Sequence, residues 1–307
     1  MPVDDDLLRR FEEGLDPSDI GASAVSASIL GYGEISTVFR IGDDETTAFK
    51  RMPLFGDRPA AEAYADRYSE YCRLLREAGL KLPEGETRIV EPTSRPVVLY
   101  ITQARIPTDR FAHQLIHVLE PNDIRDLLEG IVTEIDKVWR FNQDRAPALR
   151  LAIDGQLSNW ARTDPGEAAG LYFVDTSTPM YLKDGLEQLD PELLLQAAPG
   201  FMRGVFRIFF LEEVMTRYYD PRQVFTDLTA NLFKEQRPDL VPFTVEVINQ
   251  GLGGGLDPLT VAEVERYYRG DRRIWSVALA MRRLDRWIKT RLQGRRYEFI
   301  LPGEIRR

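Results

Sequence analysis

The stretch Leu151-Ala152-Ile153-Asp154-Gly155-Gln156-Leu157-Ser158-Asn159 places an acid after a short apolar run and an amide five positions later. A second apolar run, residues 171–174, leads directly into Asp175. Carboxylate and amide oxygens are hard ligands of the kind that Mg²⁺ prefers, and Mg²⁺ also keeps waters and substrate phosphates in its shell. On its own, the same pattern is more typical of an Asp-Gly turn, a loop asparagine and an acid at a strand end.

The totals for the chain limit the classes of protein to which it could belong. Its 307 residues are enough for a large core and two lobes, and its net charge of −9 argues against a general nucleic-acid binder. The single cysteine, Cys72, excludes an internal disulfide framework. The acidic start, and the interruption of the apolar residues 201–219 by Arg203, Arg207, Glu212 and Glu213, predict a cytoplasmic protein with no membrane partner.

Upstream of Asp154, residues 24–55 are dense in strand signals. We predict strands at residues 25–30, 37–41 and 46–52, joined by a glycine-containing turn and a tight hairpin. Gly31 and Gly33 in the first turn would let backbone N–H groups approach a phosphate. Lys50 lies within the third strand among apolar neighbours, where its ammonium could reach such a phosphate as a point charge.

The next elements alternate between helix and strand. Residues 59–79 predict a helix that buries Tyr64, Tyr68 and Tyr71, with Glu70 one position from that stripe. Two strands follow at residues 87–91 and 97–101, then a connector at residues 103–107. Residues 122–142 form a strong amphipathic pattern, predicting a core helix of the second lobe.

These features follow one another in a fixed order: a glycine-containing hairpin, a strand lysine, a helix glutamate, a connector, an Asp with Asn five positions later, and an Asp after a strand. In this order the chain resembles the protein-kinase-like superfamily, in the style of its aminoglycoside phosphotransferase and choline-kinase branch. The resemblance covers residues 29–175 and implies a two-lobed α+β fold, with an antiparallel sheet lobe followed by a larger, mostly helical lobe. We expect an acidic N-terminal helix at residues 1–20, a nucleotide-binding N-lobe at residues 21–106 and a C-lobe at residues 107–307. The implied cofactors are ATP and Mg²⁺.

The resemblance also assigns roles by position. The loop over the nucleotide phosphates would comprise Gly31, Gly33, Ser36 and Val38. Lys50 would bind the α and β phosphates and be held by Glu70. The adenine edge would meet Gln103 and Ala104, Asp154 would orient or deprotonate the acceptor, and Asn159 and Asp175 would hold Mg²⁺.

Several positions depart from the family pattern. Ser36 replaces the third glycine of the loop, Ala152 and Ile153 stand where His and Arg or Gly are usual, and Thr176 and Ser177 follow Asp175 in place of Phe and Gly. No Ala-Pro-Glu motif occurs downstream. We therefore favour a phosphotransferase acting on a small-molecule hydroxyl or amine. The alternatives are a protein Ser/Thr kinase-like enzyme and a nucleotide-binding pseudokinase scaffold.

The last third of the chain predicts helices without a recognised motif. They are expected at residues 191–198, 200–219, 221–235, 241–249, 260–268 and 272–293, and the glycine-rich residues 251–255 read as a flexible connector. The last helix has an apolar stripe, comprising Ile274, Val277, Ala278, Met281, Leu284, Ile288 and Leu292, opposite a very basic face. We expect the stripe to be packed and the basic face solvated. Docking of an acidic partner, such as the chain's own start, or of an anionic substrate is the alternative.

Overall fold

Five antiparallel strands form the sheet of the N-terminal lobe, in the order β1-β2-β3-β5-β4. The computed structural model describes residues 4–33, 35–164, 166–167, 169–196, 216–251 and 256–302. The strands are β1 (Ala27–Tyr32), β2 (Thr37–Ile41), β3 (Thr47–Phe55), β4 (Gly85–Val90) and β5 (Val97–Ala104). Their apolar, β-branched and aromatic residues suit a pleated surface that is buried on both sides.

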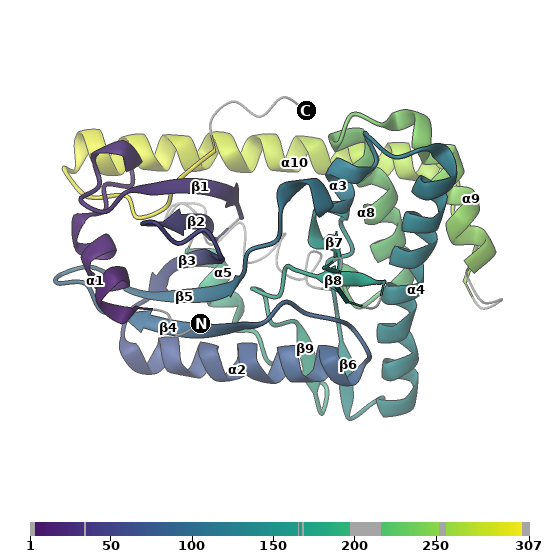
Figure 1. Cartoon of the computed structure of the whole chain (residues 1–307), viewed down its shortest axis with the longest axis horizontal. Helices are drawn as coiled ribbons and strands as arrows, with labels where there is room; N and C mark the ends of the chain where they lie inside the picture. Colours follow the sequence, from purple (N-terminus) through teal and green to yellow (C-terminus); the bar gives the residue numbers. More distant parts are fainter. Residues whose placement is uncertain are drawn as a thin grey trace.

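A helix covers each face of this sheet. Helix α2 (Arg58–Glu77) runs beneath the strands and buries its tyrosine stripe with Met52 and Leu99 (Figure 1). Helix α1 (Asp5–Gly14) packs Leu8 and Phe11 on the other face. Because side chains alternate along a strand, β3 presents Lys50 to the α2 side and Arg51 to the α1 side.

The second lobe is mostly helical and contains three small antiparallel ladders. Its helices are α3 (Ala112–Leu115), α4 (Pro121–Arg145), α5 (Pro191–Gln196), α8 (Pro221–Lys234) and α9 (Val241–Gly251). Its strands are β6 (Leu149–Leu151), β7 (Trp160–Arg162), β8 (Leu171–Phe173), β9 (Tyr181–Lys183) and β10 (Leu186–Glu187). Strand β6 pairs with β9, and β7 pairs with β8. The two-lobed α+β architecture expected from the sequence is thus confirmed.

One long helix, α10 (Val261–Trp287), runs along the outer edge of both lobes (Figure 1). It joins the two helices predicted at residues 260–268 and 272–293, starts at a Thr260 capping box and continues into a π-helical turn, Ile288–Leu292. Among the helices of the described residues, none is long and apolar enough to cross a membrane.

The prediction that the apolar stripe of this helix is packed is wrong for four of its side chains. Ile274, Val277, Leu284 and Leu292 are exposed. The cause is the surface against which the helix packs. Arg282 and Lys289 lie over the rings of Phe299 and Tyr297 in the following segment, and Asp285 is buried beside Lys289. The inward side of this part of α10 is therefore largely polar.

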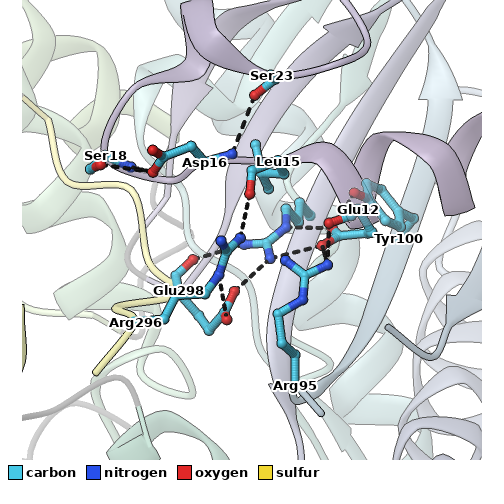
Figure 2. Close-up of polar contacts among 10 residues, drawn as sticks. Glu12, Leu15, Asp16, Ser18, Ser23, Arg95, Tyr100, Arg296 and Glu298 are labelled. Carbon is cyan, nitrogen blue, oxygen red and sulfur yellow. Dashed lines mark hydrogen bonds and ion pairs between the residues drawn. The ribbon is translucent and has the colours of Figure 1, made fainter. Parts of the chain in front are cut away.

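A buried ionic cluster ties both ends of the chain to the N-lobe sheet. Glu12 of α1 and Glu298 near the C-terminus both accept hydrogen bonds from Arg51 of β3 (Figure 2). Arg51 donates to Glu12 at 2.5 and 3.0 Å and to the Glu298 carboxylate at 3.1 Å, and Tyr100 also donates to Glu12. Burial alone would lower the pKa of Arg51, but the attraction of Glu12 outweighs it and raises that pKa.

Three predictions for the C-terminal third lie partly outside the described residues, among them the helix expected at residues 191–198, which is described only to residue 196. The helix expected at residues 200–219 is described only from residue 216, and residues 252–255 of the glycine-rich connector are not described. The described part of the helix predicted at residues 191–198 is α5, and the helices predicted at residues 221–235 and 241–249 are present as α8 and α9.

Candidate active site

Strand β3 positions Lys50 on the side of the sheet from which its ammonium reaches Asp175 of the second lobe. Lys50 is paired with Val38 of β2 and with Ile101 of β5, so the three side chains share one face. Gln103 belongs to the same face because it follows Ile101 by two residues. It donates a hydrogen bond to the carbonyl oxygen of Val174 at 3.3 Å, which connects the sheet to the second lobe.

Lys50 makes an ion pair with Asp175, 2.7 Å from Nζ to Oδ1. Its ammonium also donates to the Ser177 hydroxyl at 2.9 Å, and that hydroxyl donates to Asp175 at 2.7 Å. Partial burial would raise the pKa of Asp175, but Lys50 and Ser177 outweigh it and hold that pKa below its usual value. Asp175 is therefore an anion at neutral pH, as a metal ligand must be.

The expected contact between Lys50 and Glu70 is not present. Both Glu70 oxygens accept hydrogen bonds from Arg73 on the same helix, at 2.8 and 2.9 Å. The Glu70 side chain is 40% exposed, whereas Lys50 is 13% exposed and engaged by Asp175. The physical reason is local: a residue three positions away on one helix is an immediate neighbour, so Arg73 satisfies the carboxylate.

The β7–β8 hairpin brings the two proposed metal residues to one end of a ladder. Trp160 pairs with Phe173, and the Val174 amide donates to the Asn159 carbonyl at 2.8 Å. Asn159 is therefore opposite the residue that precedes Asp175. The Asn159 side-chain nitrogen donates to the Asp154 carbonyl at 3.0 Å, so Oδ1 is the side-chain atom that could ligate a metal.

No cluster of three or more His, Cys, Asp or Glu side chains suited to a metal occurs in the part of the chain that the structure describes. A cation at this site would therefore depend on Asp175, the amide oxygen of Asn159, water and substrate phosphates. Mg²⁺ is the metal that binds in this way, with few protein ligands and several waters.

The loop after β6 carries Asp154. The Gln156 amide donates to an Asp154 carboxylate oxygen at 3.1 Å, an Asx-type turn. Gly155 is needed for close packing, because a Cβ there would lie 2.8 Å from Val224 and 3.1 Å from Ile135. Lys234 of α8 lies 3.4 Å from the Gln156 side-chain oxygen, so it brings a positive charge near this loop.

Two tyrosines of α2 connect that helix to the loops that carry Asp154 and Asp175. Tyr64 donates to the Ser177 carbonyl at 2.5 Å, and Tyr71 donates to the Ala152 carbonyl at 2.7 Å. The sequence predicted both as packing residues and missed these bonds. The signal was present, because buried tyrosine hydroxyls need hydrogen-bond partners.

Of the phosphate-loop candidates, Gly31 and Val38 pair with each other in β1 and β2, and Gly33 and Ser36 lie between the two strands. The Gly33 amide donates to the Ser36 carbonyl at 3.0 Å, and a Cβ at Gly33 would lie 2.5 Å from the Ser36 hydroxyl. Gly33 thus allows the turn to close over buried Ser36. Gly31 is next to an irregularity in the β1–β2 ladder, with open space around it.

Comparison with known proteins gives a family for the chain. The model of a family of unknown function, DUF6206, matches residues 19–286. The chain belongs to this family. No curated protein matches the DUF6206 chain in sequence.

Solved structures that are similar to the DUF6206 chain have low sequence identity. WaaP, in a complex with acyl carrier protein, is 11% identical over 80% of this chain and 89% of that chain, with a TM-score of 0.36. The GDP complex of aminoglycoside 2'-phosphotransferase-IIIa is 10% identical over 74% of this chain and 92% of that chain, with a TM-score of 0.34.

The end of β5 in the DUF6206 chain differs from the expected adenine contact. The Ala104 amide donates to the Glu84 carbonyl at 2.9 Å, and the next amide, that of Arg105, donates to Thr46 at 2.7 Å. Neither N–H group is available to an adenine edge. Gln103 directs its side-chain amide to the Val174 carbonyl, so it joins the two lobes at this point.

Proposed function

We propose that this chain is an ATP- and Mg²⁺-dependent phosphotransferase acting on a small-molecule hydroxyl or amine. The observation that carries the proposal is the ion pair between Lys50 and Asp175, which joins a strand of one lobe to the loop after β8 in the other. An ammonium binds phosphate oxygens and a carboxylate binds Mg²⁺, so this pair brings together the two groups that a metal nucleotide needs.

The other residues take roles consistent with their positions. Asn159 and Asp175 would hold Mg²⁺, and Lys50 would hold the α and β phosphates beneath the turn formed by Gly31, Gly33 and Ser36. Asp154 would orient the acceptor. Bound Mg²⁺ would neutralise the charge on the transferring phosphoryl group, so the protein contributes mainly by positioning and electrostatic stabilisation.

A pseudokinase scaffold and an enzyme would both bind nucleotide, but only the enzyme would turn ATP over. A turnover measurement therefore distinguishes the two alternatives. Ala152 and Ile153, which motivated the alternative, are fully buried in the core beside Asp154. The Tyr71 hydroxyl holds the Ala152 carbonyl and thereby fixes the loop without the usual histidine and arginine.

Nucleotide binding tests the proposal before the acceptor is known. Thermal unfolding of the wild-type chain should show stabilisation by ATP with Mg²⁺ and a smaller effect of ATP with EDTA. At about 100 times Kd, binding adds about 2.7 kcal/mol to the free energy of unfolding. Asp175→Asn should lose the Mg²⁺-dependent part of the shift because it removes an anionic metal ligand.

The matched control is Asp126→Asn, which makes the same chemical change at an exposed position of α4. It should behave like the wild type. An unchanged melting temperature of the wild type with ATP and Mg²⁺ would exclude the proposed function. An equal shift in EDTA, or in Asp175→Asn, would exclude the metal assignment.

A further inference from the structure

Helix α10 presents large apolar side chains to solvent. Ile274 is 47% exposed, Val277 59%, Leu284 44% and Trp287 52%. At about 100° per residue these four occupy an arc of about 140° on one side of the helix. Leu292, in the π-helical turn that follows, is 67% exposed. Large apolar side chains exposed along one side of a helix are typical of an interaction site.

The second part of this helix and the segment that follows it are strongly cationic within an acidic chain. Residues 269–296 contain ten arginines and lysines and two acids, whereas the whole chain has a net charge of −9. The exposed arginines of this region include Arg269, Arg272, Arg286, Arg291 and Arg295. Within the part of the chain that the structure describes, none of these five arginines forms an ion pair with an acid.

The two acids of this region, Asp271 and Asp285, interact with basic side chains of the protein itself. Asp285 is 5% exposed and pairs with Lys289 at 2.8 Å, and Asp271 lies 3.6 Å from Arg217. A hollow of about 450 Å³ lies along the first half of the exposed side, lined by Tyr268, Arg269, Arg272, Ser276 and Val277. Two arginines and a tyrosine at one hollow suit an anionic headgroup.

A second copy of the chain is a poor occupant for this face. A symmetric contact places the same patch of each copy against the other, so arginines would meet arginines. The chain's own acidic start is not the occupant either. Asp5 pairs with Arg88, Asp6 pairs with Arg9, and α1 packs against the N-lobe sheet.

We propose that the exposed face of α10 binds an anionic membrane surface, with the helix lying in the plane of the interface. Helices of this type bury an apolar face with Trp and Leu in the headgroup region and use flanking arginines to attract anionic lipids. Because α10 runs along one edge of both lobes, binding would place that long edge on the lipid (Figure 1). This replaces the expectation of no membrane partner and does not depend on phosphotransfer.

Vesicle co-sedimentation of the full chain tests the inference. The probe is vesicles of phosphatidylcholine, alone or mixed with phosphatidylglycerol, at low and high salt. We expect binding to the anionic vesicles only, weakened by salt because the attraction is screened. The double substitution Leu284→Ser and Trp287→Ser should weaken it by at least about tenfold, since two buried apolar side chains are lost.

The control is the double substitution Val118→Ser and Leu186→Ser, at positions that are 76% and 70% exposed but lie outside α10. It should bind like the wild type, and circular dichroism should show that both double variants are folded. Equal binding to neutral vesicles, or no binding to anionic ones, overturns the proposal. A dimer of the wild type that the Leu284 and Trp287 variant converts to a monomer also overturns it, in favour of a second copy.

Discussion

Replacing Glu12 with alanine is expected to lower the free energy of unfolding by about 3–5 kcal/mol, because it leaves a buried arginine without its main counterion. Glu12 is fully buried and Arg51 is 2% exposed. Glu298 cannot take over the whole ionic interaction. Its carboxylate accepts from a single guanidinium nitrogen at 3.1 Å and its second contact is through the uncharged backbone carbonyl at 2.8 Å, whereas the Glu12 carboxylate accepts from two nitrogens. Urea unfolding of the two chains measures the difference.

Two variants separate the ionic pair from simple loss of packing. Glu62→Ala removes an exposed carboxylate that pairs with Arg58 on the surface, and it should leave stability unchanged. The double substitution Glu12→Leu and Arg51→Met removes both charges and should recover much of the lost stability. If Glu12→Ala unfolds at the same urea concentration as Glu62→Ala, the buried cluster does not hold the two ends of the chain to the sheet.

The second large effect concerns turnover. Lys50→Ala and Asp175→Ala should each lower Mg²⁺-dependent ATP turnover by at least about 100-fold, the scale of losing one electrostatic contact to a transition state. Glu70→Ala should cost less than about tenfold, because Glu70 is bonded to Arg73 and not to Lys50. Hydrolysis of labelled ATP without an added acceptor provides the measurement.

The contrast between these variants distinguishes the observed pairing from the one usual in kinases. A loss in Glu70→Ala as large as that in Lys50→Ala would mean that α2 rotates to bring Glu70 to the lysine during the reaction. Wild-type turnover in Lys50→Ala would mean that Lys50 is not part of the active site.

The parts of the fold that the sequence predicts well are governed by local patterns. Strand alternation, the glycine turn and the strand–loop–strand unit from Asp154 to Asp175 depend on residues close together in the chain. These local patterns predict the N-lobe sheet and the β7–β8 hairpin. They also predict that Asn159 lies opposite Val174, the residue before Asp175.

The parts that the sequence does not predict depend on which side of a helix meets which surface. Periodicity places Glu70 near the buried stripe of α2 but cannot choose between Lys50 and the nearer Arg73. Periodicity also identifies the apolar stripe of α10. It does not show that Arg282 and Lys289 on the other side of the helix pack against the rings of Phe299 and Tyr297 in the following segment. The cluster around Arg51 unites Glu12 with Glu298, residues from opposite ends of the chain that no local pattern connects.

A crystal structure of the chain with Mn²⁺ and a non-hydrolysable ATP analogue tests the central claim most directly, because Mn²⁺ can be located by its anomalous scattering. We predict a manganese peak bound by the side-chain oxygens of Asp175 and Asn159, with the Lys50 ammonium on a phosphate oxygen of the same nucleotide. Nucleotide bound elsewhere, or no manganese at Asp175 under saturating ligand, would contradict the assignment of these residues to a phosphotransfer site.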